Sequence, residues 1–240
     1  MVDHQVLEPD SRLRERADLD LATLRAQVPG GLAIMYEYVM KTVLRREGGL
    51  WHLGSGPNIE GGLITLCTCK HYMRTFSGVQ PGTWIAGFSS SRKGRNGYPR
   101  QRNTLFYLTQ VQYAFASQMA LWRSPHVPLR ARVRKSARSN HLGDLYVPRD
   151  GAEAPFAIES YHPPMPEHSH AFASDEPGGW YRDIDFLTRY GRRPSLLVGD
   201  PQLSFVWTQP RIDSRPTIGR GQVRFDSMRE FLASLVDARA

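Results

Sequence analysis

Thr104-Leu105-Phe106-Tyr107-Leu108-Thr109-Gln110-Val111 is the stretch that decides the fold class of this chain. Aromatic, aliphatic and β-branched residues fill it, and these residue types suit the pleated, half-buried surface of a sheet. A Gly/Ser-rich basic loop precedes it, as expected where a strand begins after a connection. The stretch therefore predicts a β-strand near the middle of the chain.

Further runs of this kind lie upstream. The turn Pro81-Gly82 introduces a strand over 83–88, and two earlier strands are predicted over 33–40 and 62–69. Residues 45–62 contain six glycines, so we expect a loop there in spite of Trp51.

Downstream, a short helix is expected over 116–123 and two late strands over 195–198 and 203–207. The region 139–180 between them is rich in Pro, Gly, His and Ser and predicts irregular structure. Strands thus dominate the middle of the chain, and their connections favour a mixed or mainly antiparallel sheet over a repeated strand–helix–strand array.

Helices are expected at both ends. Residues 11–28 have apolar residues at helical spacing and stop at Pro29-Gly30-Gly31. Near the C-terminus, Ser227 and Glu230 form a capping box ahead of an apolar stripe that runs to Val236. The predicted fold is α+β, with a β-barrel-like core over 33–212, an N-terminal helical extension over 1–32, and a C-terminal linker and helix over 213–240.

Composition limits the class of protein. The chain has 240 residues, of which 40% are hydrophobic and 10% aromatic, as in folded globular proteins. It contains no apolar run near the roughly 18–20 residues that span a bilayer, and its polar N-terminus lacks a signal-peptide pattern. We expect a cytoplasmic protein without a membrane partner. Two cysteines are too few for a zinc site, so reduced thiols, no metal and no cofactor are expected.

Positive charge is concentrated in two segments. The net charge is +8 and the sequence pI is about 9.8, which favours a polyanionic partner such as nucleic acid or a nucleotide. The bland alternative is two solvated loops kept soluble by their charge. The side chains predicted to contact nucleic-acid phosphates are Arg92, Lys93, Arg95, Arg100, Arg102, Arg130, Arg132, Arg134 and Lys135.

The run from Gly62 to Arg74 contains several side chains that could react with or bind a ligand. It holds both cysteines, Cys67 and Cys69, with Lys70 and Arg74 close behind. We expect Cys67, inside a strand, to pack as a small apolar residue. Cys69 is either a second packing residue or a thiol whose reactive thiolate is stabilised by the neighbouring cations.

Other motifs point to no chemistry. His162, Glu167, His168 and His170 lie in a proline-rich segment without ligand spacing, so a solvated loop is expected there rather than a metal site. The sequence contains no Walker loop, dinucleotide-binding fingerprint, zinc-protease motif or nucleophile elbow.

Taken in order, several pieces of the chain resemble the nucleotide modification associated domain proteins, specifically the small family with a Thr-Cys-Lys-Pro motif. Bacteria and phages encode these proteins, often near genes for DNA base modification. The matching pieces are Pro57-Asn58, Gly62, Thr65-Leu66, Thr68-Cys69-Lys70, Arg74, Gly82-Thr83-Trp84-Ile85-Ala86-Gly87, Leu105, Tyr107, Val111 and Gly143-Asp144-Leu145-Tyr146.

The chain also departs from the family pattern. Thr83 stands where the family has Asp, and His71 stands where it has the proline after lysine. The family's His-Asp-Ser-Gly is only loosely echoed by His52 and Ser55-Gly56. A role for the missing acid or for His52 is therefore not carried over.

The resemblance implies a PUA-like domain linked to DNA base modification or its recognition, with nucleic acid or a nucleotide as partner. A nucleotide or modified base would lie in a pocket lined by Asn58, Thr68, Cys69, Lys70, Arg74, Trp84 and Asp144. Tyr72, Trp84 or Trp51 would stack on the base. One alternative is an enzyme of nucleotide or base modification that uses Cys69 as nucleophile and Lys70 as electrostatic stabiliser. Another is a structural subunit of a modification or defence complex, with a protein partner.

Overall fold

The computed structural model describes residues 11–46, 49–54, 56–76, 78–90, 102–166, 168, 179–215, 218 and 221–238. The chain forms two compact units, and each is described by itself. Unit 1 comprises Met1–Leu53, Gly82–Gln110 and Pro201–Ala240, and unit 2 comprises Gly54–Pro81 and Val111–Asp200. This division differs from the predicted segments 1–32, 33–212 and 213–240, because each unit is built from separated parts of the sequence.

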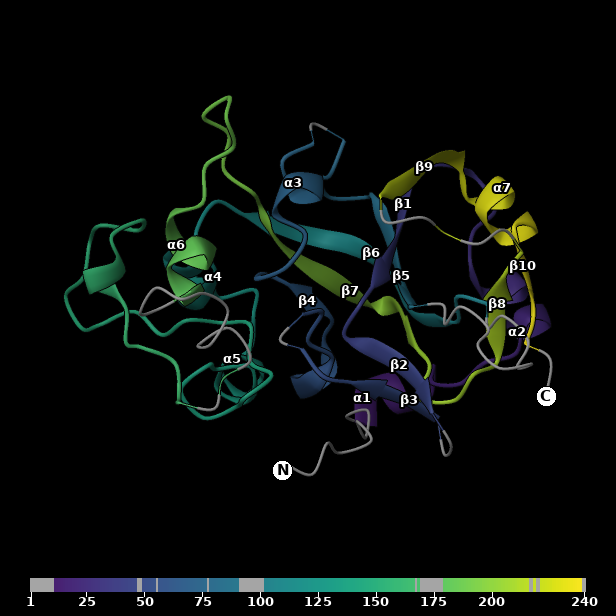
Figure 1. Ribbon diagram of the computed structural model, residues 1–240, viewed down its shortest axis with the longest axis horizontal. Helices are drawn as coiled ribbons and strands as arrows, with labels where there is room; N and C mark the ends of the chain where they lie inside the picture. Colours follow the sequence, from purple (N-terminus) through teal and green to yellow (C-terminus); the bar gives the residue numbers. More distant parts are fainter. Residues whose placement is uncertain are drawn as a thin grey trace, which may run out of the picture. The chain divides into compact units, whose positions relative to one another are not determined.

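A mixed β-sheet is the main feature of the fold, so the α+β class is confirmed. Its strand order is β4-β7-β6-β5-β1-β9 (Figure 1). Strands β1 and β5 pair in parallel, whereas the pairs β1–β9, β5–β6 and β4–β7 are antiparallel. The strands span Leu32–Met40 (β1), Thr65–Leu66 (β4), Trp84–Ser89 (β5), Leu105–Phe115 (β6), Leu196–Val206 (β7) and Gln222–Ser227 (β9).

The central strands have the residues that the sequence indicated. Strand β6 contains the whole run from Leu105 to Val111 and continues to Phe115. Strand β5 is buried along its length, which explains its continuous run of apolar residues. The two late strands predicted over 195–198 and 203–207 are one continuous strand, β7. Strands β6 and β7 each pass from one unit into the other along the chain.

The expected loop over 45–62 is wrong in its first part. Strands β2 (Val43–Arg46) and β3 (Gly49–His52) form an antiparallel hairpin in unit 1, with Leu44 paired to Trp51. Leu50 is buried, and Trp51 is half-buried. Of the glycines that suggested a loop, Gly49 is thus the first residue of β3, and Gly54 lies two residues after its end.

The predicted N-terminal helix is broken in two. Helix α1 spans Ser11–Arg14 and helix α2 spans Leu21–Gln27. Between them Asp18 adopts a left-handed backbone conformation, with φ of 54°. Its carboxylate accepts hydrogen bonds from the backbone N–H groups of Thr208 and Gln209. Asp20 then caps α2 by accepting a hydrogen bond from the Thr23 N–H.

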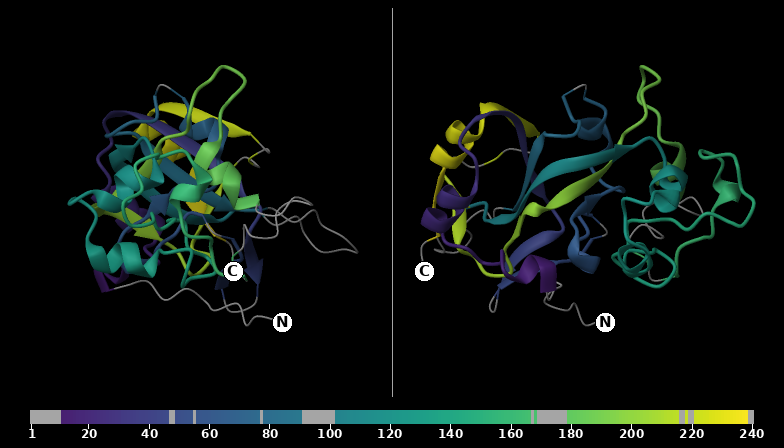
Figure 2. Two further views of the ribbon diagram at one scale, coloured as in Figure 1. Left: turned by 90° about the vertical axis from the view of Figure 1, so that its left-hand side faces the viewer. Right: turned by 180° about the vertical axis from the view of Figure 1, so that it is seen from behind.

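The C-terminal helix begins where the capping residue predicted, but it is shorter than expected. Helix α7 spans Met228–Ala233, and the Ser227 hydroxyl accepts a hydrogen bond from the Arg229 N–H at its start. Leu235–Asp237 then forms β10, which pairs with β8 (Ile212–Ser214). The apolar stripe thus continues from a helix into a strand. In Figure 2, α7, drawn in yellow, lies beside strands β1 and β9.

Besides β4 and parts of β6 and β7, the described residues of unit 2 form short helices. They are η1 (Glu60–Gly62), α3 (His71–Arg74), α4 (Gln118–Arg123), α5 (Leu129–Arg134), η2 (Ile158–Ser160), η3 (Gly179–Tyr181) and α6 (Arg182–Asp185). The helix expected over 116–123 is confirmed as α4. The strand expected over 62–69 is reduced to the two residues of β4, and helix α3 begins five residues after this strand ends.

Among the described residues of unit 2, two apolar clusters are buried. One joins Leu63 and Cys67 to residues of the α4–α5 region and of β7, and the other surrounds Tyr146 and Trp180. Among the described residues, no helix is both long and apolar enough to cross a lipid bilayer.

Candidate functional site

The segment from Cys69 to Arg74 lies in unit 2, where the chain leaves strand β4 and enters helix α3. Lys70 precedes α3 and adopts a left-handed conformation, with φ of 56°. This conformation is costly for a residue that carries a Cβ. Cys69 and Lys70 are partly exposed, whereas Thr68 is buried.

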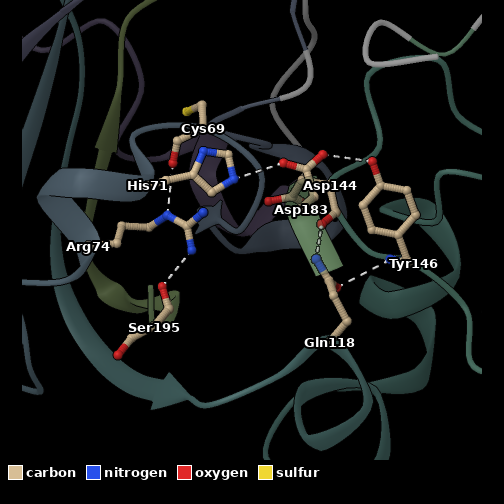
Figure 3. Close-up of polar contacts among 8 residues, drawn as sticks. All are labelled: Cys69, His71, Arg74, Gln118, Asp144, Tyr146, Asp183 and Ser195. Atoms are coloured by element: carbon tan, nitrogen blue, oxygen red, sulfur yellow. Dashed lines mark hydrogen bonds and ion pairs between the residues drawn. The ribbon is translucent and has the colours of Figure 1, made fainter. Parts of the chain in front are cut away.

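Arg74 is the buried cation of this segment, with 1% of its surface exposed. Its Nε donates to the Cys69 carbonyl at 2.8 Å, and its Nη1 donates to the Ser195 carbonyl at 2.7 Å (Figure 3). Its Nη2 is also buried and finds no hydrogen-bond acceptor among the described residues. Burial lowers the pKa of the guanidinium, although arginine still keeps its charge at neutral pH.

The surroundings of the Cys69 thiol raise its pKa rather than lower it. Burial raises its pKa to about 11, and this effect outweighs the opposing influence of Arg74 and Lys70. The sulfur packs against Gly56, where an added Cβ would lie 2.9 Å from Sγ. In Figure 3 the sulfur also points away from the His71 ring. Of the two alternatives left open for Cys69, packing and a stabilised thiolate, this raised pKa favours packing, because desolvation opposes the thiolate more than the nearby positive charge supports it.

Cys67 packs as the sequence indicated. It has no exposed surface and belongs to the cluster that contains Leu63, Leu121 and Leu145. Burial raises the pKa of its thiol well above the ordinary value. Its role is apolar packing.

Asn58 is held in a network of internal contacts. Its Oδ1 accepts from the Glu60 N–H and from Lys135 Nζ, and its Nδ2 donates to the Leu142 carbonyl. Lys135 Nζ also donates to the carbonyls of Asn58 and Leu63, at 2.7 and 2.9 Å. The side-chain oxygen and nitrogen of Asn58 thus bond within unit 2, which gives this residue a structural role.

Asp144 is a second buried group near the same segment. Its Oδ1 accepts from the Thr65 hydroxyl at 2.9 Å, and Thr65 stands on β4. Burial raises the pKa of Asp144 to about 6, and the charge of Lys135 partly opposes this shift. The structure therefore brings Asp144, Asn58 and the Cys-x-Cys segment together in one unit.

A pair formed by His71 and Asp183 was missed at the sequence level. His71 Nε2 lies 3.0 Å from Asp183 Oδ1, and the Tyr146 hydroxyl donates to Asp183 Oδ2 at 2.9 Å (Figure 3). The His71 ring stacks on Phe186, with ring centroids 4.6 Å apart. A carboxylate that orients an imidazole is an arrangement used in acid–base chemistry. Asp183 lies 112 positions from His71, and no local pattern in the sequence marks it.

The residues proposed to stack or to bind phosphate lie in different settings. Trp84 belongs to unit 1 and is 1% exposed, so it offers no face to a ligand. Trp51 is half-buried, whereas Tyr72 on α3 is 62% exposed. Arg102 is exposed, and Arg92, Lys93, Arg95 and Arg100 lie outside the described residues.

The second basic segment is helix α5 and its C-terminal residue. Arg130 and Arg134 are exposed, and Arg132 is half-buried and donates to the Trp122 carbonyl. Lys135 has no exposed surface, and burial lowers its pKa to about 8. The prediction that Lys135 contacts phosphate does not fit this position, because its ammonium group is enclosed by carbonyl oxygens.

The histidine-containing segment is described in part. His168 is buried, and its Nε2 lies 2.6 Å from the Gly143 carbonyl, while Glu167 and His170 lie outside the described residues. Within the described part of the chain, no group of three or more His, Cys, Asp or Glu residues is placed to hold a metal ion.

No family model, curated protein or solved structure matches this chain. The resemblance to the nucleotide modification associated domain proteins therefore stays a prediction, and the function has to be argued from the site itself.

Proposed function

We propose that this protein binds nucleic acid or a nucleotide through the Cys69–Arg74 segment of unit 2. One observation carries the proposal: the buried guanidinium of Arg74 is fixed by two backbone carbonyls, and its Nη2 has no acceptor among the described residues. A buried donor without an acceptor is costly. An anionic oxygen of a ligand would satisfy it, and arginine is well suited to phosphate.

Features around Arg74 support the same function. Lys70 keeps a strained left-handed conformation, and such strain is concentrated at binding and catalytic sites. Tyr72 is exposed two residues later and offers a ring on which a base can stack. The whole chain has a net charge of +8, which favours a polyanionic partner.

The finer identity rests on the sequence resemblance alone. On that ground we propose a PUA-like domain of a bacterial or phage protein that acts in DNA base modification or its recognition. The mixed sheet is compatible with this identity, but proteins with many unrelated functions also contain such a sheet. A cytoplasmic location and a partner protein in a modification or defence complex are proposals of the same kind.

Fluorescence anisotropy with labelled single-stranded DNA, duplex DNA and RNA tests the binding proposal. Affinity should fall roughly tenfold or more between 50 and 200 mM salt if two or three phosphates are contacted. Lys70→Ala and Tyr72→Ala should weaken binding without unfolding the protein, because both side chains are partly or largely exposed. Arg215→Ala, an exposed cation in unit 1, is the matched control for loss of charge. Binding that does not respond to salt, or equal losses in all three variants, would contradict the proposal.

Catalysis by Cys69 and Lys70 is the second candidate function, and the geometry favours it less. The raised pKa of the Cys69 thiol leaves little thiolate at neutral pH. What supports chemistry here is the His71–Asp183 pair. If the protein is an enzyme, His71→Asn should abolish turnover while Cys69→Ser keeps it. The reverse result would restore Cys69 as the nucleophile.

A further inference from the structure

We infer that the loop between α6 and β7 extends the binding surface, so that the ligand is a single strand of DNA or RNA whose bases stack on Tyr72 and Tyr190. This inference rests on the proposed function, because it names the class of nucleic acid and a further contact of the same site. We call residues 187–194 of unit 2 the Tyr190 loop. Figures 1 and 2 show that this loop, drawn in light green, projects from the ribbon beyond α6 and the start of β7.

Two tyrosines expose their rings in this part of unit 2. Tyr190 is 72% exposed and Tyr72 on α3 is 62% exposed. The guanidinium of Arg189 lies over the Tyr190 ring, with Cζ 4.6 Å from the ring centroid. Exposed aromatic rings beside arginines are the side chains on which unpaired bases stack, because every base offers a π-face.

The Tyr190 loop is fastened to α3 at both of its ends. Phe186 precedes the loop, and its ring lies edge-on to Tyr72, with centroids 5.5 Å apart. Ser195 follows the loop, and its carbonyl accepts from Arg74 Nη1 at 2.7 Å (Figure 3). The Ser195 N–H donates to the Arg74 carbonyl at 3.3 Å. The loop that carries Tyr190 and the helix that carries Tyr72 are therefore held against each other.

The shape of the loop is set by its own hydrogen bonds. The Thr188 hydroxyl oxygen accepts from the N–H groups of Tyr190 and Arg192, at 3.3 and 3.0 Å. The Thr188 N–H donates to the Arg192 carbonyl, and its carbonyl accepts from the Gly191 N–H, each at 2.9 Å. Gly191 has φ of 70°, which suits glycine. Tyr190 thus stands on a turn that is formed before a ligand binds, which lowers the entropy cost of binding.

Positive charge surrounds these rings. Asp183 is buried and accepts a hydrogen bond from the Tyr146 hydroxyl, whereas Asp185 is exposed. Residues 181–193, all of which the structure describes, hold three exposed arginines beside this one exposed carboxylate; they are Arg182, Arg189 and Arg192. The excess of arginine favours a chain of phosphates over a protein partner.

The exposed rings favour a single strand over a duplex. In a duplex, neighbouring base pairs cover the faces of each base, so that only an unpaired base can stack on a side chain. Arginines alone would serve the phosphates of either form. Tyr72 and Tyr190 are therefore the feature that selects the single strand.

The test presents one sequence as single-stranded DNA, single-stranded RNA and blunt duplex DNA, each with the same fluorophore. Anisotropy should show at least one single strand binding about tenfold or more tightly than the duplex, since stacking adds to the phosphate contacts. A difference between the DNA and RNA strands identifies which of the two is preferred, and equal affinities mean that the surface accepts both.

Three substitutions of Tyr190 separate stacking from other contacts. Tyr190→Ala should weaken binding of the single strand about fivefold to a hundredfold and leave duplex binding nearly unchanged. Tyr190→Phe keeps the ring and should bind like the parent protein. Tyr190→Leu keeps an exposed apolar side chain without a ring and should bind as weakly as Tyr190→Ala. All three should fold, because the bonds that close the turn come from Thr188 and the backbone.

The failure of this inference and that of the proposed function give different results. Duplex and single strand bound equally, or a single strand bound as tightly by Tyr190→Ala as by the parent, would overturn the Tyr190 loop as a stacking surface. The same holds if only a mononucleotide binds. In each of these cases Lys70→Ala would still weaken binding, and the proposed function would stand. Absence of binding by every nucleic acid and by mononucleotides would overturn both.

Discussion

Gly143 shows how a single residue shapes the buried side of the site. A Cβ at this position would lie 2.7 Å from three backbone atoms of residues 135–137. The close approach lets the N–H groups of Asp144 and Leu145 both reach the Lys135 carbonyl, each at 3.1 Å. Glycine is required here by the absence of space.

Gly143→Ala should therefore lower the free energy of unfolding by about 1–3 kcal/mol, because backbone cannot move aside as a flexible side chain can. Gly31→Ala is the matched control, since an added Cβ at Gly31 meets nothing within 4 Å. Denaturant unfolding of both variants checks the prediction. Equal midpoints would show that residues 135–137 shift to make room.

Lys70 allows backbone strain and ligand binding to be separated. Glycine at this position removes the left-handed strain together with the side-chain charge, so Lys70→Gly should raise the free energy of unfolding by about 1 kcal/mol. If Lys70 contacts the ligand, the same variant should bind nucleic acid more weakly. Lys70→Arg keeps charge and strain and should preserve both properties. A Lys70→Gly protein that is more stable and binds as well as the parent would remove Lys70 from the site.

At the scale of elements, the end of helix α5 is fastened by one buried ammonium group. Lys135 is the residue that ends the helix, and its Nζ bonds to Asn58 and Leu63, some seventy residues earlier in the chain. The helix is thereby tied to the segment that leads into β4. Removing the ammonium would take the donor from the Leu63 carbonyl and one of the donors from Asn58, whose carbonyl also accepts from the Thr65 N–H. Asp144 would also lose a neighbouring positive charge.

Lys135→Met should accordingly cost about 2–4 kcal/mol of stability, the range expected when one partner of a buried polar network is lost. Arg134→Met, one residue earlier and exposed, should change stability by less than about 0.5 kcal/mol. Thermal or chemical unfolding distinguishes the two. A small effect of Lys135→Met would mean that the network adds little to the stability of unit 2.

Helix α5 also shows which parts of the fold could not be predicted from the sequence. The central strands and helix α4 follow from apolar and aromatic runs, because their burial depends on local residue types. Helix α5 carries three arginines among six residues and has no apolar stripe to reveal it. Lys135 looks like its arginine neighbours in the sequence, and only the tertiary contacts of its ammonium group separate it from them.

The sequence predicted only those residues of the candidate site that lie within recognisable sequence motifs. The sequence singled out Cys69, Lys70, Arg74 and Asp144, which the structure places in one unit. It could not find Asp183, because the significance of this residue comes from its long-range contact with His71. It also could not weigh burial against charge, so it left open whether Cys69 packs or reacts, whereas burial raises the pKa of this thiol to about 11.

At the scale of the whole molecule, each unit contains a carboxyl group whose pKa is raised by burial. In unit 2, burial raises the pKa of Asp144 from 3.8 to about 6, and in unit 1 burial raises that of Glu37 from 4.5 to about 7. A raised pKa means that the folded protein holds the proton more tightly than the unfolded chain. The stability that these groups contribute is therefore present at low pH. It is lost as the pH rises from 3.8 to about 6 for Asp144 and from 4.5 to about 7 for Glu37.

Glu37 gives the cleaner test, because its Oε2 is buried without a partner among the described residues. Its contribution is complete below pH 4.5 and is lost by about pH 7. Glu37→Gln should thus stabilise the protein more at pH 8 than at pH 5, by about 1–2 kcal/mol, which is less than the full shift because solvent screens part of the charge. Glu15→Gln, an exposed carboxyl group in the same unit, is the control and should show no such difference. Denaturant unfolding of both variants at pH 5 and pH 8 tests this prediction. If Glu37→Gln changed the free energy of unfolding equally at both values, Glu37 would be ionised at both, and burial in strand β1 would not raise its pKa.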